Sequence, residues 1–243
     1  MMERSVYAVD AAIEETHWWF SGRRRLFARE LARGGVTARA CALDTGTSAG
    51  TNLRMLKQLG FRNVTGLDIS EDAIAFCEAK GLGPVEQGDI CAMPFADDSF
   101  DLVLATDVIE HVEEDDGALR EIARVLRPGG ALLLTVPAFE LLWGLQDRVS
   151  KHKRRYRLKP LAEKLTVAGL RVQRAYYFNY LLFIPILMAR RAIDALGITL
   201  KSEGQVNTPL LNRLLAAVFA WDIRTAPLLK PPFGVSILVV ATK

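Results

Sequence analysis

The chain has 243 residues, of which 50% are hydrophobic and 24% are charged. This composition excludes a disordered chain, and the length suits one large α/β domain rather than two independent domains. The net charge of +3 is too small to indicate nucleic acid binding by itself. No window reaches the roughly 18–20 continuous apolar residues of a membrane span, and the N-terminus lacks the apolar core of a secretory signal. The cysteines, Cys41, Cys77 and Cys91, show no CxxC spacing, so we expect reduced thiols in a cytoplasmic protein.

Residues 3–33 are predicted to be helical, because apolar residues recur at helical spacing up to a Gly-Gly pair at 34–35. After this segment, strands and helices alternate. Short apolar runs predict strands near 39–44, 63–68, 84–88, 100–106 and 130–136. Helices are expected between them, near 50–59, 71–80 and 115–126. This alternation is typical of an α/β fold with a doubly wound, parallel sheet and right-handed crossovers.

The pattern changes beyond residue 137. Residues 138–160 read as either loop or helix and lead to a short helix that ends at Gly169. Strands are then expected at 171–178 and at 234–243. The 55 or so residues between these strands are far more than a hairpin needs, so we expect a helical insert at about 179–233.

Acidic residues follow the predicted strands. Asp44 ends the first strand, Asp68 the second and Asp89 the third, at intervals of 24 and 21 residues. The fourth strand ends in Thr106, Asp107, Glu110 and His111. In an open parallel sheet, ligands bind at the carboxyl ends of the strands, so these side chains are expected to line one site.

Each acid suits one part of a cofactor. A carboxylate at Asp68 can accept both hydroxyl hydrogens of a ribose, and Asp89 can accept an adenine amine. Asp44 lies beside a loop of small residues, Gly46, Thr47, Ser48, Ala49 and Gly50, where a dinucleotide would place its pyrophosphate. A negative charge repels phosphate, so this position favours S-adenosylmethionine, which carries a sulfonium and an ammonium but no phosphate.

Five stretches then resemble class I S-adenosylmethionine-dependent methyltransferases, most closely the small bacterial type related to quinone-biosynthesis methyltransferases. They are LDTGTSAG, GLDIS, QGDI, FDLVLATDVIEHV and EIARVLRPGGALLLTVP, in family order over residues 40–137. The resemblance implies a Rossmann-like, seven-stranded sheet whose last strand, GVSILVVATK, is antiparallel. Ser48 departs from the family loop, acid-x-Gly-x-Gly-x-Gly, because it replaces the middle glycine.

The resemblance also implies site roles and a division of the single domain. Residues 36–137 form the cofactor-binding core, residues 1–35 a helical lid, and residues 138–243 the substrate-side half. The methionine portion would lie against the first loop and the end of the fourth strand, and the adenosine against the second and third strand ends. The residues so assigned are Asp44, Gly46, Thr47, Gly50, Thr106, Asp68, Ile69, Asp89 and Ile90.

The stretch ETHWWFSGRRR, residues 15–25, allows two interpretations. In the first, Trp19 covers the cofactor and Arg24, or its neighbour Arg23, binds the cofactor carboxylate. In the second, an amphipathic helix packs its aromatic residues on the core and exposes its arginines.

Methyl transfer from a sulfonium needs mainly alignment, and a base helps only when the acceptor carries a proton. His111, after the fourth strand, is the first candidate for that base, with a helix-start or core histidine as the alternative. His17 and His152 are weaker candidates. Because the three histidines are scattered and no Cys/His cluster is present, no metal site is expected.

The sequence says less about the acceptor. Residues 148–174 hold ten Lys or Arg and one acid, and the apolar run 176–189 follows. Together they suggest either a solvated basic face with an apolar cap over the substrate, or peripheral contact with an anionic lipid surface. A small or lipid-like acceptor is therefore expected, and no nucleic acid partner.

Two other functions compete with methyl transfer. A non-catalytic module could bind S-adenosylmethionine and act through its basic and apolar C-terminal half. An NAD-dependent oxidoreductase is disfavoured by Asp44, by the LATDVIEH strand end and by the expected antiparallel last strand.

Overall fold

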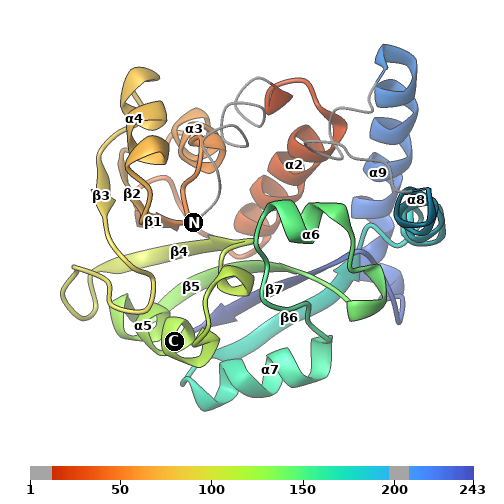
Figure 1. Ribbon diagram of the computed structural model, residues 1–243. Coiled ribbons are helices and arrows are strands. Elements are labelled where there is room, and N and C mark those ends of the chain that lie inside the picture. The colour runs from red at the N-terminus through yellow and green to blue at the C-terminus, as the bar shows by residue number, and fades with distance from the viewer. Residues whose placement is uncertain (1–12, 197–207) are drawn as a thin grey trace.

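The computed structural model describes residues 13–196 and 208–243. A seven-stranded sheet with the order β3-β2-β1-β4-β5-β7-β6 runs through it (Figure 1). The strands β1 to β5 are parallel to their neighbours among themselves, and β7 is antiparallel to both β5 and β6. The predicted doubly wound, mostly parallel sheet with an antiparallel last strand is thus confirmed.

The elements have the following bounds. The strands are β1 (Cys41–Thr45), β2 (Asn63–Asp68), β3 (Val85–Gln87), β4 (Phe100–Thr106), β5 (Leu126–Pro137), β6 (Arg171–Phe178) and β7 (Ser236–Thr242). The α-helices are α2 (Trp18–Arg33), α3 (Thr51–Gln58), α4 (Glu71–Ala79), α5 (Asp115–Val125), α6 (Leu145–Val149), α7 (Leu158–Val167), α8 (Phe183–Ala195) and α9 (Pro209–Leu229). Two short 3₁₀ turns are η1 (Ile109–His111) and η2 (Glu140–Leu142).

The structure differs from the predicted elements in a few places. The fifth strand begins at Leu126 instead of 130, because Leu126 pairs with Phe100 before a register shift leads to the pair Leu102 and Ala131. The segment 138–160, which reads as loop or helix, contains η2 and α6. Residues 3–12 of the expected N-terminal helix and 197–207 of the expected insert lie outside the described residues.

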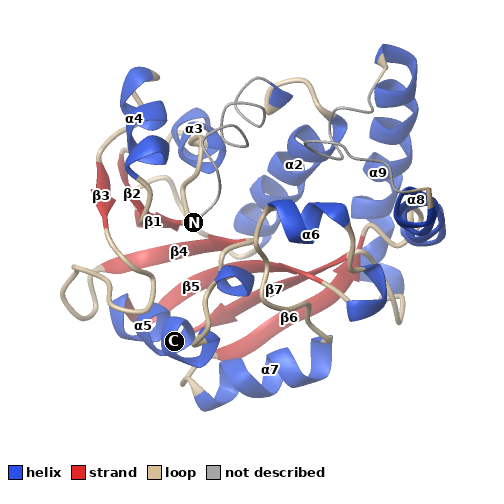
Figure 2. Ribbon diagram, in the orientation of Figure 1, coloured by secondary structure: helices blue, strands red, loops and turns tan. Residues whose placement is uncertain are grey.

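Alternation along the strands divides the core into two layers. On β1, Leu43 packs with α5 and α7, whereas its neighbour Ala42 packs with α2 and α3. The same alternation holds for Val103 and Leu104 on β4. Helices therefore cover both faces of the sheet, with α5 and α7 below it and α2 and α3 above it in Figure 2, as buried parallel strands require.

A cluster of aromatic rings joins the N-terminal helix to α9. The ring of Phe219 lies 5.4 Å from that of Trp18, 5.3 Å from that of Trp19 and 6.2 Å from that of Phe178. The backbone of α2 also lies close to α9 at Gly22, where an added Cβ would lie 2.2 Å from the Phe219 ring. Segments almost 200 residues apart in the sequence are thus packed as one unit above the sheet.

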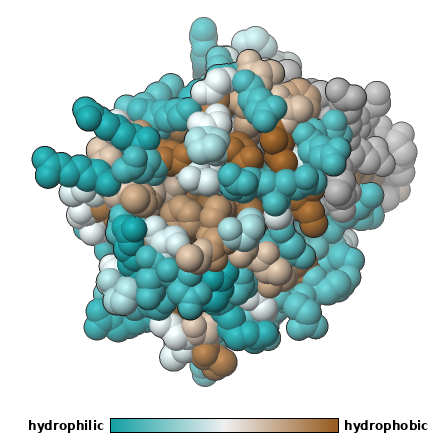
Figure 3. Space-filling model, turned by 90° about the vertical axis from the view of Figure 1, so that its left-hand side faces the viewer, coloured by the Kyte–Doolittle hydropathy of each residue, from teal (hydrophilic) through white to brown (hydrophobic). Residues whose placement is uncertain are grey.

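The surface beside β3 mixes polar and apolar residues. Figure 3 shows that face, with apolar residues gathered near its middle and polar residues around them. Within the described residues, no helix combines the length and the apolar character that a membrane crossing needs.

The aromatic cluster gives a stability prediction. Phe219 is fully buried, so Phe219→Ala should lower the free energy of unfolding by about 3–5 kcal/mol, because it removes ring contacts and leaves a cavity. Chemical denaturation followed by circular dichroism measures this change. Trp221→Ala is the matched control, since Trp221 lies on the same helix but is 65% exposed. Its effect should stay within about 0.5 kcal/mol. Equal effects of both substitutions on the free energy of unfolding would contradict the role of the aromatic cluster in holding α9 against α2.

Candidate active site

A cavity of about 860 Å³ lies at the carboxyl ends of the parallel strands. Its walls come from α2, the loops after β1, β2, β3 and β4, the segment 146–155, and the helices α8 and α9. Most of the predicted site residues line it: Trp19, Arg24, Gly46, Thr47, Asp68, Ile69, Asp89, Ile90, Thr106 and His111. The side chain of Asp44 lies behind the wall, and Gly50 shapes the loop without lining the cavity.

The loop after β1 needs its glycines. Gly46 has a φ of 67° and Gly50 a φ of 87°, both in the left-handed region that favours glycine. An added Cβ would lie 2.6 Å from Val108 at the first position and 2.6 Å from Leu82 at the second. Ser48 also has a positive φ, 52°, in the left-handed region that favours glycine. Its backbone N–H donates to the Asp68 carboxylate at 2.9 Å.

Asp44 is fully buried behind this loop. Its Oδ1 accepts a hydrogen bond from Asn52 at 2.9 Å, while its Oδ2 has no partner among the described residues. Burial raises the pKa of the Asp44 carboxyl to about 7, and the nearby Asp68 adds to this effect. A cationic group at this end of the cavity would stabilise the ionised form of Asp44.

The next two strand ends differ from each other. Asp68 is 7% exposed and accepts hydrogen bonds from the backbone N–H of Ser48 and of Ser70, both at 2.9 Å. Burial raises the pKa of Asp68, while these N–H groups lower it. Asp89 is exposed and holds the Cys91 N–H at 2.9 Å. Both carboxylates thus reach the cavity from well-defined turns.

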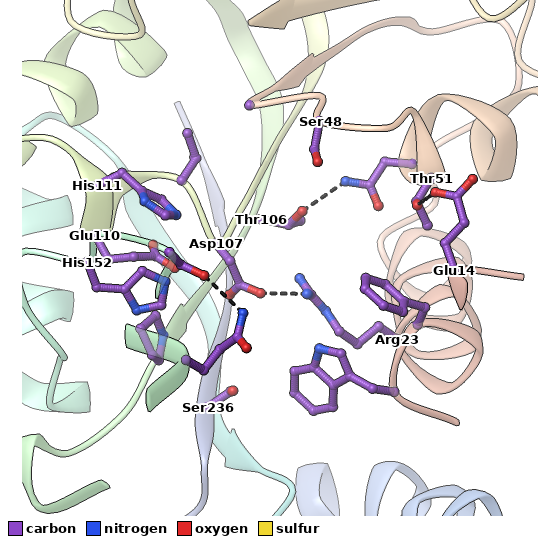
Figure 4. Close-up of a pocket in the computed structure, with 18 of the residues that line it drawn as sticks. Glu14, Arg23, Ser48, Thr51, Thr106, Asp107, Glu110, His111, His152 and Ser236 are labelled. Atoms are coloured by element: carbon purple, nitrogen blue, oxygen red, sulfur yellow. Dashed lines mark hydrogen bonds and ion pairs between the residues drawn. The ribbon is translucent and has the colours of Figure 1, made fainter. Parts of the chain in front are cut away.

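The α2 wall presents Arg23 to the strand ends more directly than Arg24. Arg23 forms an ion pair with Asp107 at 2.5 Å (Figure 4). It also donates to the Thr135 hydroxyl at 3.0 Å. Arg24 also lines the cavity, but its guanidinium donates to the backbone carbonyls of Glu14 and Glu15. Arg23 thus lies closer to the strand ends but is already paired with Asp107, and binding of a cofactor carboxylate by either arginine stays a prediction.

The structure shows the aromatic packing of the second interpretation of the HWWF stretch, whereas its arginines Arg23 and Arg24 are not exposed, and a cover over the cofactor stays a prediction. Trp19 lines the cavity and also stacks on Phe178 with ring centroids 6.0 Å apart. His17 begins α2, and its ring Nδ1 accepts a hydrogen bond from the Trp19 N–H. His17 is therefore a helix cap in this structure.

Asn52 and Glu14 are site residues that the sequence patterns did not reveal. Asn52 bridges two strand ends, since its amide donates to Asp44 and, at 2.8 Å, to the Thr106 hydroxyl. Glu14 is 2% exposed and accepts from Thr51 and Lys80, which ties the chain before α2 to α3 and α4. The only signal for Asn52 was its position in the first turn after the glycine loop.

The loop after β4 contributes Glu110 and His111. Glu110 is fully buried, and burial together with the charge of Asp107 raises the pKa of its carboxyl well above the usual range. Burial lowers the pKa of His111 to about 4, with a further contribution from His152. At neutral pH, His111 is therefore an uncharged imidazole beside the cavity, able to accept a hydrogen bond but with a weak hold on a proton.

These features define an α/β enzyme that binds a nucleoside-containing cofactor at the ends of its parallel strands. Residues 43–134 match the family model described as "Methyltransferase domain". The chain is 31% identical to a malonyl-[acyl-carrier protein] O-methyltransferase of Enterobacter lignolyticus, over 81% of this chain and 77% of that protein. It belongs to the S-adenosylmethionine-dependent methyltransferases, as the resemblance predicts.

Solved structures share the fold. A protein of Haloferax volcanii in complex with the Trm112 methyltransferase activator gives a TM-score of 0.65 at 21% identity, over 100% of this chain and 98% of that one. The TM-score is 0.58, at 19% identity, for phosphoethanolamine N-methyltransferase 2 of Haemonchus contortus in complex with S-adenosyl-L-methionine. That match covers 90% of this chain and 52% of that one.

The site fits S-adenosylmethionine, the methyl donor of this family. The unpartnered Asp44 oxygen lies behind the loop that would meet the cationic end of the donor. At Gly46, no room is left for a side chain between the loop and Val108. When bound, S-adenosylmethionine supplies an electrophilic methyl group.

Asp44 predicts a pH dependence of donor binding. The ionised carboxylate attracts the cationic donor, and its pKa in the folded protein is about 7 against a usual 3.8. Affinity for S-adenosylmethionine, relative to that of an Asp44→Asn variant, should therefore increase from about pH 6 to about pH 8. Titration calorimetry at several pH values measures both proteins. A wild-type to variant ratio that stays constant with pH would contradict this role.

Proposed function

We propose that this methyltransferase acts on an acceptor with an apolar, lipid-like portion, and that the acceptor lies between η1, α8 and α9. The supporting observation is the extent of the cavity, which continues beyond the strand ends to apolar side chains of the two C-terminal helices. Those side chains are Ile186, Ile193, Leu211 and Leu215. A volume of about 860 Å³ lies in the upper part of the range of small-molecule sites, about 300–1,000 Å³.

In this proposal, the chain divides as its sequence suggests. Residues 36–137 hold the donor through Asp44, the glycine loop, Asp68 and Asp89. The described part of the predicted lid, residues 13–35, covers it, with Arg23 or Arg24 at the donor carboxylate. Residues 138–243 supply the acceptor side. Holding both reactants in line provides most of the rate, and His111 accepts a hydrogen bond from a protonated acceptor atom.

Acceptor selectivity can be tested with bacterial extracts and S-adenosylmethionine labelled in its methyl group. Label is expected in the organic phase after extraction, because the proposed acceptor has an apolar portion. Label found only in water-soluble metabolites or in protein would overturn the proposal.

Two alanines on α8 provide a matched pair for the same assay. Both are exposed, but Ala189 lines the cavity and Ala192 does not. Ala189→Glu should lower methyl transfer at least tenfold through repulsion of the apolar portion, with the Kd for S-adenosylmethionine unchanged. Ala192→Glu should transfer at the wild-type rate.

We also propose peripheral contact with a lipid surface, through α9 rather than through the basic segment 148–174. Several cations of that segment are paired with acids, such as Lys153 with Glu113 and Lys164 with Asp115. One face of α9 instead carries exposed apolar residues at helical spacing. These are Leu210, Leu214, Trp221 and Leu228, between 60% and 80% exposed.

Basic residues border that face of α9. Arg213 and Arg224 are exposed at positions next to the apolar stripe and would meet anionic head groups. The helix lies at the right-hand edge of the molecule in Figure 1. Its other side contributes Leu215 to the cavity, so a lipid-like acceptor would have a short path from the surface to the site.

Vesicle flotation tests this contact. The protein should float with vesicles that contain phosphatidylglycerol, and a variant with Leu214→Glu and Trp221→Glu should remain at the bottom of the gradient. Val167→Glu is the control, since Val167 is 90% exposed on α7, away from the stripe. Equal flotation of both variants would contradict the proposal.

A further inference from the structure

Glu110, His111 and His152 meet on the acceptor side of the cavity. The first two belong to η1, which follows β4, and His152 follows α6. One potential ligand atom from each residue lies within 4.8 Å of the others, and all three residues line the cavity (Figure 4). The expectation that no metal site is present rests on the scatter of the histidines in the sequence, and the fold brings two of them together.

Backbone contacts fix this meeting point. The Lys153 N–H donates to the Glu110 carbonyl at 2.7 Å, and the Tyr156 hydroxyl donates to the Ile109 carbonyl at 3.3 Å. The two histidine rings lie edge to face, with centroids 4.7 Å apart. The cluster is therefore held by the loop after β4 and the segment after α6, both anchored to the rest of the fold.

The carboxyl group of Glu110 is buried and unsatisfied. It is 0% exposed, and neither of its carboxylate oxygens has a hydrogen-bond partner among the described residues. The nearby Arg23 pairs with Asp107 instead. A buried carboxyl group without a partner destabilises the fold unless a ligand or a cation satisfies it.

His152 has the outer contact typical of a metal ligand. The ring Nδ1 of His152 lies 2.8 Å from Oδ1 of Asp147, and Arg155 holds that carboxylate with contacts of 2.8 and 2.9 Å. This leaves Nε2 of His152 available. Metal-binding histidines usually donate their second ring N–H to a carboxylate or a backbone carbonyl in this way.

We propose that Glu110, His111 and His152 bind a divalent transition metal ion of the kind that imidazole and carboxylate ligands favour, such as Zn²⁺. Two nitrogens and one carboxylate oxygen satisfy three positions and leave the rest open toward the cavity. Ligands of one Zn²⁺ lie about 3–3.5 Å apart, so the three side chains must close inward slightly by rotation. The open positions suit an oxygen atom of the acceptor, which would bind the ion in place of its hydrogen bond to His111. This last role, unlike metal binding itself, rests on the proposed function.

Metal titration tests the site without any methyl transfer. Untagged protein, stripped with a chelator and dialysed, is titrated with Zn²⁺ in competition with a chromophoric chelator, and with Co²⁺ while visible absorption is recorded. We expect one ion per chain and the intense visible bands of four- or five-coordinate Co²⁺. Glu110→Gln and His152→Gln should each weaken Zn²⁺ binding at least 100-fold and remove those bands.

Further variants separate the site from nonspecific binding and misfolding. Asp147→Asn should weaken Zn²⁺ binding about 10–100-fold, because it loosens the orientation of the His152 ring. His17→Gln removes the remaining histidine of the chain and should bind Zn²⁺ like the wild type. Circular dichroism and affinity for S-adenosylhomocysteine check that each variant is folded. Absence of Zn²⁺ binding by the wild type, or equal binding by Glu110→Gln, would overturn the metal site, whereas methyl label found only in water-soluble products or in protein would overturn only the proposed function.

Discussion

Carboxyl groups crowded at the ends of β1, β2 and β4 impose the main electrostatic constraint on this molecule. Asp44 and Glu110 are fully buried, Asp68 nearly so, and Asp107 needs the guanidinium of Arg23. Burial raises the pKa of Asp44 and of Glu110, and the neighbouring charges of Asp68 and Asp107 raise them further. The site is thus prepared for cations, and the fold must supply or admit positive charge there.

The N-terminal helix supplies part of that charge. Arg23 reaches Asp107 only because α2 is held against the sheet, and the rings around Phe219 hold it there. A helix of the insert therefore fixes the position of an arginine on another helix that lies far away in the sequence. The packing of the aromatic rings around Phe219 therefore determines where the positive charge of Arg23 lies at the strand ends.

Much of the fold follows from local patterns. Short apolar runs and the acids that end them place β1, β2 and β4 correctly, since buried parallel strands need continuous apolar sequence. The site is less readable, because its polar contacts join distant segments. Nothing in the sequence around Asn52 indicates that it bridges Asp44 and Thr106, and nothing near His152 indicates that its ring meets that of His111. Which of Arg23 and Arg24 faces the strand ends likewise depends on the rotation of α2 about its axis. The apolar pattern of the helix does not distinguish between two consecutive residues.

The position of β7 has a consequence for biosynthesis. β6 pairs with β7 alone, and β7 separates it from β5. During translation, β1 to β5 can assemble while the rest of the chain is still being made. The β6 edge must wait until residues 236–242 have left the ribosome, because β6 has no other strand partner. A nascent chain stalled before that point would leave the β5 edge and the apolar faces of the later elements open to chaperones or to aggregation.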